Sequence, residues 1–548
     1  MTERSLFSGA RGKTLASALG GIGLGGRHEI LWSVAAGLVY GLAIALLTFR
    51  TELSVNSDGA YLLSGAVHLA AGHGLIGFDG EPLAYWPPVY PALMAVAVKL
   101  GFDVRWGAWA VNALAAFGTM SAIAYWLLTT CERRALALLG MVACAGLHPL
   151  LELLSDVHPD GLLLGLTLHS IAGAAVWLRG NPRGLVYGLV FAALAAVTKY
   201  QGLGILMGWG LLALMRARER GLTATVRTLA GVVIATSPLA AWLVRNVTMA
   251  GSPTGDRSTT NTMADYVSRY LPSVLDGVTS WYLPESLPTS LRVAIVVAGV
   301  VVLGVTLALL LRHERAHAAA RAGGAALITM SGTYLVFTLV ASIASMALGI
   351  QRYLALLAPM FVMMTMLALD RLAVRGNRKI VGVAAAVVAF VLLAVPMVRS
   401  AHMAARIQEG KAGYVYGDWY TEIRPALKQF PFDGVVLSNH AGFVWTSARV
   451  PERRVEQATW QEWLAAGPEA ARGHIVALLT APSPIIPAPA RNLYFVEIYK
   501  SDHKALYAAD LEKAFRLTPL VRVADGAIWK LECPEVCKFP GYAPAARP

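Results

Sequence analysis

The stretch NSDGAYLLSGAVHLAAGHG, residues 56–74, follows the apolar run 30–49 after a short polar break. A helix of about 20 apolar residues is long enough to cross a bilayer, so residues 30–49 are predicted to be a first membrane span. The stretch after it contains one carboxylate, Asp58, among glycine, histidine and aromatic residues. It is therefore predicted to begin a long loop just outside the first span.

The composition of the whole chain is typical of a membrane protein with many spans. Of its 548 residues, 56% are hydrophobic and only 14% are charged, whereas soluble proteins carry roughly 25% charged residues. About eleven apolar runs qualify as spans or nearly do so. They are 30–49, 108–128, 135–150, 161–178, 185–198, 203–215, 228–244, 291–311, 323–347, 354–369 and 380–397. The fifth and sixth are short, which indicates helices that end below the surface or line a cavity.

The net charge of +13 predicts an orientation in the membrane. Most Lys and Arg residues before the C-terminal region lie in short clusters between apolar runs, such as CERR at 131–134 and RLAVRGNRK at 371–379. Because cytoplasmic loops are rich in Lys and Arg, the charge is assigned to topology, and no nucleic-acid partner is expected. The tail 1–29 is then cytoplasmic, followed by an uncleaved signal anchor. The alternate loops face outward: 50–107, 151–160, 245–290 and 348–353.

The C-terminal residues 398–548 have a different character and, with eleven spans, lie on the periplasmic side of a bacterial inner membrane. The segments FDGVVLSN, HIVALLT and NLYFVEIY look like strands, and TPLVRVADGAIWKLE like a closing hairpin. Helical stretches near 418–429, 456–467 and 503–515 separate them. The predicted fold is thus an α-helical polytopic membrane domain, 30–397, followed by a small periplasmic α/β domain.

Four cysteines occur in the chain, and Cys533 and Cys537 form the motif CPEVC. They are close enough in sequence to form a small disulfide if that end faces an oxidising compartment. Without a nearby histidine they make a weak zinc site.

The long and polar loops lie on the predicted outer side, so a reaction site is expected there. The chain has no GxxxxGK[ST] loop, and the cytoplasmic loops are too short to hold ATP or a nucleotide sugar. A reaction outside the cytoplasm needs an energy-rich donor that has already crossed the membrane. A lipid-linked sugar meets this requirement.

Four motifs occur in an order that resembles a known family. They are the first outer loop with SDGAY, GHG and PPVYP, then SDVHPDGLLL, RNVTMAGSPTGDR and QRYLALLAP. The set resembles GT-C glycosyltransferases, and most closely the branch of protein O-mannosyltransferases and the lipid A aminoarabinose transferase. It covers roughly residues 30–370, and VVLSNHAGFVWTSARVP resembles the periplasmic domain of some bacterial members. The resemblance implies transfer of a monosaccharide from a polyprenyl phosphate to a periplasmic glycolipid, polysaccharide or protein.

The same resemblance implies that Asp58 is the general base of an inverting transfer. The chemistry agrees, because the acceptor hydroxyl must lose its proton as it attacks the anomeric carbon. A single displacement needs one carboxylate, whereas a retaining mechanism needs two at close range. The structural alternative is that Asp58 caps a helix starting at Gly59.

A second group, Asp156, His158 and Asp160, lies on a short outer loop without Lys or Arg. The family commonly places a second acid facing the same cavity, and Asp156 is the residue we expect to orient the acceptor or contact the sugar. In the alternatives, the three residues bind a divalent metal, or Asp160 caps the fourth span while His158 has no role. No cofactor is expected.

The leaving lipid phosphate needs cations to stabilise its charge. We expect this role of Lys199 and Arg352, which lie on the side that is poor in positive charge, and then of Arg245 and Arg257. The alternative is that such side chains extend to the headgroups.

The candidates for substrate binding are His158 of the second group, His73, in GHG, and the aromatic residues Tyr61, Trp86 and Tyr90. Aromatic rings stack on sugars or polyprenyl chains, but they are also common at membrane interfaces, and a loop histidine is more often structural. Three rival functions are left open: a transporter or flippase of lipid-linked saccharides, a ligase that transfers whole polysaccharide chains, and a non-catalytic scaffold. The sequence does not fix the oligomeric state.

Overall fold

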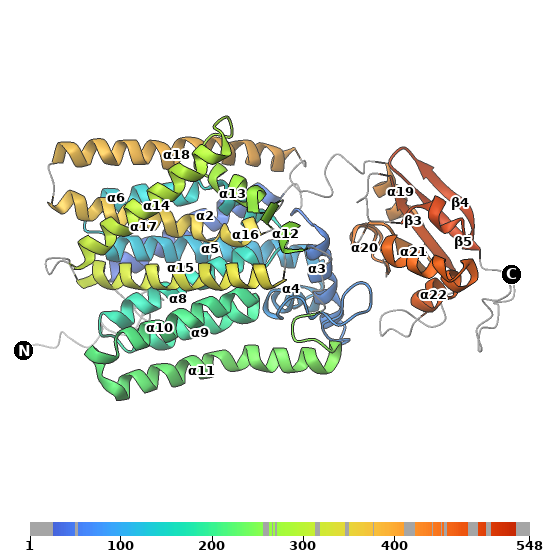
Figure 1. The fold of residues 1–548 in the computed structure, drawn as a ribbon, viewed down its shortest axis with the longest axis horizontal. Coiled ribbons are helices and arrows are strands. Elements are labelled where there is room, and N and C mark those ends of the chain that lie inside the picture. Colours follow the sequence, from blue (N-terminus) through green and yellow to red (C-terminus); the bar gives the residue numbers. More distant parts are fainter. Residues whose placement is uncertain are drawn as a thin grey trace, which may run out of the picture.

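The structure is a computed structural model. It describes residues 26–49, 53–255, 262–265, 267–268, 271–312, 318–345, 350–375, 378–409, 422–440, 442–450, 452–453, 457–480, 492–499 and 506–532. Long helices form a bundle, and the C-terminal part lies beyond one end of it (Figure 1).

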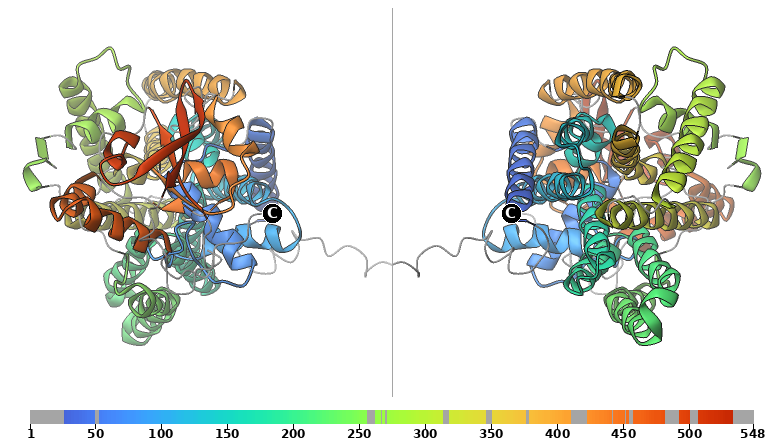
Figure 2. Two further views of the ribbon diagram at one scale, coloured as in Figure 1. Left: turned by 90° about the vertical axis from the view of Figure 1, so that its right-hand side faces the viewer. Right: turned by 90° about the vertical axis from the view of Figure 1, so that its left-hand side faces the viewer.

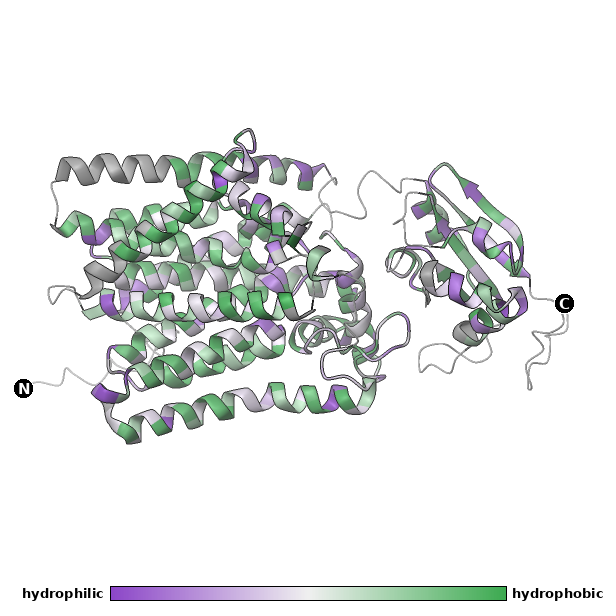
Figure 3. Cartoon of the chain, viewed as in Figure 1, coloured by the Kyte–Doolittle hydropathy of each residue, from purple (hydrophilic) through white to green (hydrophobic). Residues whose placement is uncertain are grey.

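The bundle consists of helices that run side by side (Figure 1). Its main members are α2 (Arg27–Phe49), α5 (Val104–Thr130), α8 (Asp160–Leu178), α9 (Arg183–Thr198), α10 (Leu203–Met215), α11 (Ala217–Ala250), α14 (Thr289–Arg312), α15 (Ala318–Ser345), α17 (Leu357–Arg375) and α18 (Arg378–Gln408). Their outer faces are largely apolar (Figure 3), and Leu38, Val39 and Leu42 of α2 are more than half exposed. Such a surface is suited to lipid.

Six helices among the described residues are long and apolar enough to span a membrane. A seventh span results if α6 (Arg134–Ala145) and α7 (His148–Ser155), which are bent by 53° relative to each other, count as one. Each of the eleven predicted runs overlaps a helix, but eleven spans are not confirmed. One reason is that α9 and α10 are shorter than a full span.

Two short helices, α3 (Ser57–Ala70) and α4 (Val89–Lys99), lie at the end of the bundle that faces the C-terminal part (Figure 1). The Asn56 side chain caps α3 by accepting a hydrogen bond of 2.8 Å from the backbone N–H of Gly59. The capping role considered for Asp58 therefore belongs to Asn56, and the Asp58 carboxylate is available for other contacts. Shorter elements complete this region: η1 (Tyr200–Gly202), α12 (Met263–Asp265), α13 (Leu271–Ser280) and α16 (Ile350–Leu354).

The C-terminal part is built on a five-stranded mixed sheet of order β2-β1-β3-β5-β4. The strands are β1 (Val435–Ser438), β2 (Glu452–Arg453), β3 (Leu493–Ile498), β4 (Arg516–Val523) and β5 (Gly526–Glu532). Its helices are α19 (Ile423–Gln429), α20 (Phe443–Ala448), α21 (Gln457–Ala465), α22 (Pro468–Thr480) and α23 (Ala508–Leu511). The predicted strands in FDGVVLSN and NLYFVEIY and the closing hairpin β4–β5 are confirmed.

The strand predicted for HIVALLT is wrong, because these residues form the second half of α22. Short apolar runs do not distinguish a buried strand from a buried helix face. Here Ala471 and Ile475, four residues apart, are both fully buried against the sheet cluster, which is the spacing of one helical face.

The helix α20 contacts the membrane part at α3. The backbone of Gly442, which precedes α20, has a φ of +77°, and a Cβ added there would lie 2.5 Å from Ala60 Cβ. The Arg105 side chain of α5 donates a hydrogen bond of 3.0 Å to the carbonyl of Thr446, and Trp445 is buried in the core cluster of the membrane part. Figure 2 shows the C-terminal part in front of this end of the bundle. Hence α20 rests on the helix that carries Asp58.

Candidate active site

A short backbone pairing holds Asp58 close to the junction of α7 and α8. Ser54 donates its N–H to the carbonyl of Ser155 at 3.2 Å and accepts from the N–H of Val157 at 2.8 Å. Asp58 lies four residues after Ser54, in the first turn of α3, and His158 follows Val157 directly. The pairing therefore brings the side chains of Asp58 and His158 together. The glycine of the SDGAY motif permits the close approach: a Cβ on Gly59 would lie 2.9 Å from the carbonyl oxygen of Val157.

The two oxygens of the Asp58 carboxylate have different surroundings. Oδ2 lies 3.0 Å from Nε2 of His158 and accepts a hydrogen bond of 3.2 Å from the Arg352 guanidinium. Oδ1 has no hydrogen-bond or ion-pair partner among the described residues. The Asp58 side chain is 37% exposed, whereas His158 is buried. One oxygen is thus fixed by two nitrogen groups and the other is open to a ligand.

Behind His158, the buried carboxylate of Asp160 gathers three cationic or basic groups. Nδ1 of His158 lies 2.7 Å from Asp160 Oδ2, and Nε of Arg352 lies 3.3 Å from the same oxygen. Nζ of Lys199 lies 2.5 Å from Oδ1 and 4.2 Å from the centre of the Tyr353 ring. Lys199 and Arg352 therefore balance the charges of Asp58 and Asp160.

The packing of α8 against α9 explains the pair of Asp160 and Lys199. Asp160 begins α8, and Lys199 directly follows α9. The two helices approach so closely that a Cβ on Gly173 would lie 2.6 Å from Cα of Gly188. Antiparallel helices in such contact bring the start of the first beside the end of the second. The short fifth run of the sequence ends at this ion pair.

Burial and charge act in opposite directions on Asp58. Burial alone raises the pKa of a carboxyl group, but the hydrogen bond and charge of His158, followed by the charge of Arg352, outweigh it and hold the pKa of Asp58 well below its usual range. Burial raises the pKa of Asp156 above its usual value, although a hydrogen bond with Ser54 opposes the change. Asp58 is therefore the acid that stays ionised over a wide pH range.

The contacts of Asp156 support the backbone pairing with Ser54 rather than the side-chain group around Asp58. Its carbonyl accepts a hydrogen bond of 2.7 Å from the Asn112 side chain, and its backbone pairs with Ser54. Tyr90 donates to the Asn112 side chain at 2.9 Å and is fully buried. Tyr90 thus supports the loop from inside and has no exposed surface for a sugar. The role expected of Asp156 as second acid stays a prediction.

Four other candidates lie on the neighbouring loop 71–88 or its supports. Tyr61 donates to the Asp79 carboxylate at 2.8 Å and stacks on Trp86, with ring centres 5.6 Å apart. His73 is exposed, and Arg245 donates to the carbonyls of Leu75 and Leu83. These contacts order the loop, and none of them joins the group around Asp58.

Some predicted residues lie outside the described part of the chain, namely Arg257, Cys533 and Cys537. Within the described part, no group of three or more His, Cys, Asp or Glu side chains is arranged to hold a metal ion. Cys131 and Cys144 are buried and free.

Two members of the cluster were not selected as site residues from the sequence. Asp160 was considered as a helix cap or as one of three ligands of a divalent metal, but its position at the start of α8 carries no side-chain capping bond. Tyr353, beside Arg352, provides a ring surface for both cations. The signal for Asp160 was its spacing of two residues from His158, which places His158 just before α8 and Asp160 at its first residue.

The helical bundle with its C-terminal mixed sheet has the fold of solved GT-C glycosyltransferases. ArnT from Cupriavidus metallidurans, solved bound to undecaprenyl phosphate, matches with a TM-score of 0.54 over 91% of this chain and 97% of ArnT, at 14% identity. The apo state of ArnT matches with the same TM-score of 0.54, over 94% of this chain and 98% of ArnT, at 14% identity. The mycobacterial arabinofuranosyltransferase AftD matches with a TM-score of 0.50 at 13% identity, over 93% of this chain and 40% of AftD. No family model and no curated protein sequence matches. The GT-C resemblance is confirmed at the level of the fold.

Proposed function

We propose that the protein transfers a monosaccharide from a polyprenyl-phosphate donor to a hydroxyl group of an acceptor on the periplasmic side. The observation that carries the proposal is the Asp58 carboxylate, which is fixed at Oδ2 by His158 and Arg352 and open at Oδ1. The shared fold with ArnT, solved with undecaprenyl phosphate, supports a lipid phosphate as ligand.

In the proposed step, the acceptor oxygen attacks the anomeric carbon while its proton moves to Oδ1 of Asp58. The bond between the anomeric carbon and the phosphate oxygen breaks, and its electron pair leaves with the polyprenyl phosphate. Configuration at the anomeric carbon is inverted, because a single displacement occurs. His158 and Asp160 hold Asp58 in position.

Arg352 would receive the leaving phosphate. Its side chain is 27% exposed and already adjoins Asp58, whereas Lys199 is almost fully buried against Asp160. A guanidinium group binds phosphate through two parallel hydrogen bonds. When Arg352 turns toward the phosphate, Asp58 loses one stabilising cation and becomes a stronger base. The donor would thereby activate the base in its own site.

The decisive experiment compares purified wild type with Asp58→Asn on a panel of polyprenyl-phosphate monosaccharides, with membrane extract as the source of acceptor. We expect sugar transfer by the wild type and a loss of 10²-fold or more, on the order expected for a missing general base, with donor binding retained. Asp103→Asn is the matched control: Asp103 lies outside the cluster, and asparagine still caps α5.

Each outcome decides between functions. Equal turnover by wild type and Asp58→Asn would overturn the assigned base. Donor translocation across proteoliposomes without sugar transfer would identify a transporter instead. Transfer of whole glycan chains, with no use of monosaccharide donors, would identify a ligase.

A further inference from the structure

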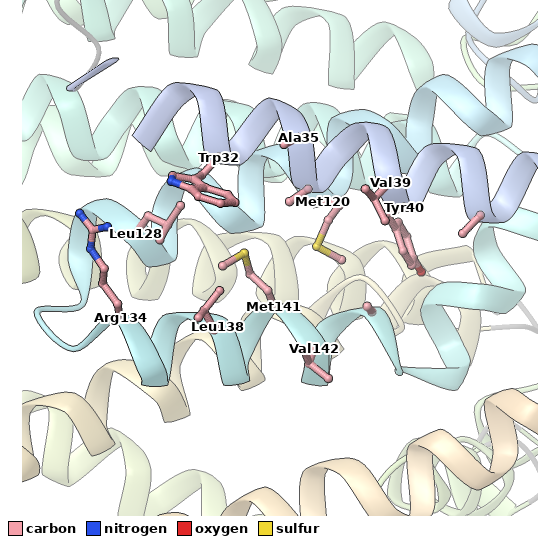
Figure 4. Close-up of a pocket in the computed structure, with 13 residues that line it drawn as sticks. Trp32, Ala35, Val39, Tyr40, Met120, Leu128, Arg134, Leu138, Met141 and Val142 are labelled. Atoms are coloured by element: carbon pink, nitrogen blue, oxygen red, sulfur yellow. The ribbon is translucent and has the colours of Figure 1, made fainter. Parts of the chain in front are cut away.

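A cavity of about 510 Å³ opens between α2, α5 and α6, away from Asp58 (Figure 4). Its walls are formed mainly by apolar side chains, such as Ala36 and Val39 of α2 and Leu138 and Val142 of α6. The cavity ends at Ala145, before the break between α6 and α7, so it does not include the residues around His158. It is a separate site within the apolar part of the bundle.

The cavity has a cation at one end. Arg134 lines it there, near Trp32 and Leu128 (Figure 4). The Arg134 side chain has no hydrogen-bond or ion-pair partner among the described residues. Glu132, two residues before Arg134, pairs instead with Arg371 at 2.9 Å, and Asp370 accepts from two backbone N–H groups. The Arg134 charge is therefore available to an external anion.

The side of the cavity toward the membrane is open. Trp32 is 63% exposed and Val142 is 52% exposed, and both lie on surfaces that an apolar solvent would cover. By the charge rule that sets the topology, Arg134 belongs to the cytoplasmic side. An occupant must therefore combine an apolar chain with an anionic group at the cytoplasmic surface.

We propose that this cavity binds an anionic glycerophospholipid of the cytoplasmic leaflet. One acyl chain lies along the apolar wall, and the phosphate forms hydrogen bonds with the Arg134 guanidinium. The donor lipid is a poorer candidate, because its phosphate must reach Asp58 beyond the opposite end of α2. The site would anchor α2 and α6 to the bilayer independently of sugar transfer.

The test measures lipid retained by the full-length protein in native mass spectrometry, after incubation with phosphatidylglycerol, phosphatidylcholine or undecaprenyl phosphate. We expect retention of phosphatidylglycerol over phosphatidylcholine. Arg134→Gln should weaken phosphatidylglycerol binding roughly tenfold, as expected for one charged hydrogen-bonding partner. Ala36→Phe, which fills the cavity, should weaken binding of both phospholipids.

Two control variants separate the site from general effects. Arg218→Gln removes an exposed cation that does not line the cavity, and Leu42→Phe enlarges an exposed residue of α2 outside it. Both should bind as wild type does. Unchanged phosphatidylglycerol binding in Arg134→Gln would overturn the proposal. Displacement of phosphatidylglycerol by undecaprenyl phosphate would assign the cavity to the donor lipid and overturn it as well.

Discussion

As the proposed base, the Asp58 carboxylate would have two tasks that oppose each other. It would have to stay ionised to accept a proton, and it would have to be basic enough to take one. The hydrogen bond with His158 and the charge of Arg352 favour ionisation, and so they weaken the base in the absence of substrate. Asp58 would become more basic if one of its two partners, His158 or Arg352, moved away during the reaction. Arg352 is the more exposed of these two side chains.

The dependence of kcat/KM on pH tests whether His158 controls the ionisation of Asp58. In wild type the depressed pKa of Asp58 keeps the carboxylate ionised as pH falls through the ordinary aspartate range, near 3.9. In His158→Gln the hydrogen bond and charge that favour the ionised form are weakened, so the pKa of Asp58 rises. We expect the acid limb of kcat/KM to move to higher pH.

His73→Gln is the control for this profile, since His73 is an exposed loop residue that does not contact the cluster. Its acid limb should coincide with that of wild type. An unshifted limb in His158→Gln, in protein that remains folded by near-UV circular dichroism, would show that His158 does not control the ionisation of Asp58.

The residues also show how far the sequence predicts the site. Asp58 is predicted from the family resemblance of the loop in which it is the lone carboxylate after a span, and Lys199 because a short span ends there. SDVHPD offers three candidates within five residues, and the choice among them depends on the pairing of Ser54 with residues 155–157. That pairing joins segments about 100 residues apart, and local patterns do not encode it. For this reason His158, which Asp160 contacts from behind, lies against Asp58.

At the scale of elements, α20 and α3 form the contact between the C-terminal part and the bundle. The contact depends on close backbone approach, because Gly442 has no space for a side chain beside Ala60 and adopts a positive φ. Sequence patterns predicted the strands and the hairpin of this part. They did not predict which of its helices rests on the bundle, because that depends on shape rather than on periodicity.

Gly442→Ala should loosen this contact. The added Cβ would overlap Ala60, and a non-glycine residue at positive φ costs roughly 1–2 kcal/mol. We expect about tenfold faster hydrogen–deuterium exchange in α20 and in the first turn of α3. Gly473→Ala in α22, where an added Cβ meets nothing within 4 Å, should leave exchange in α3 unchanged. Protection of α3 that is equal in both variants would count against the contact.

At the scale of the whole molecule, a second cluster of charged residues lies at the end of the bundle opposite Asp58. Asp370 of α17 accepts hydrogen bonds from the backbone N–H groups of Glu132 and Arg133 at 3.0 and 2.9 Å and pairs with Arg371. Glu132 and Arg133 lie at the turn after α5, about 40 Å along that helix from its start. The cluster ties two distant parts of the chain together without contacting the site.

Asp370→Ala should therefore destabilise the fold and leave the chemistry intact. It removes one of the two carboxylate partners of the buried Arg371 and leaves two backbone donors unpaired, a loss of up to about 3–5 kcal/mol by analogy with broken buried ion pairs. Thermal unfolding in detergent measures the effect, and kcat of the protein that remains folded should not change. Glu132→Gln, at a carboxylate that is 44% exposed, should cost no more than about 1 kcal/mol. A similar loss in both variants would contradict this account.

The pair of Asp160 and Lys199 also has a consequence for biosynthesis. With the topology predicted from the sequence, both residues would be carried across the bilayer as α8 and α9 are inserted, and a charge at mid-depth costs roughly 2.5–3.5 kcal/mol. Because α8 and α9 are consecutive helices joined by a short turn, they can enter the translocon as one hairpin with the two charges already opposite each other. The two side chains would then cross the membrane as an ion pair without net charge. A chain with only one of the two charges would insert less efficiently than a chain with neither.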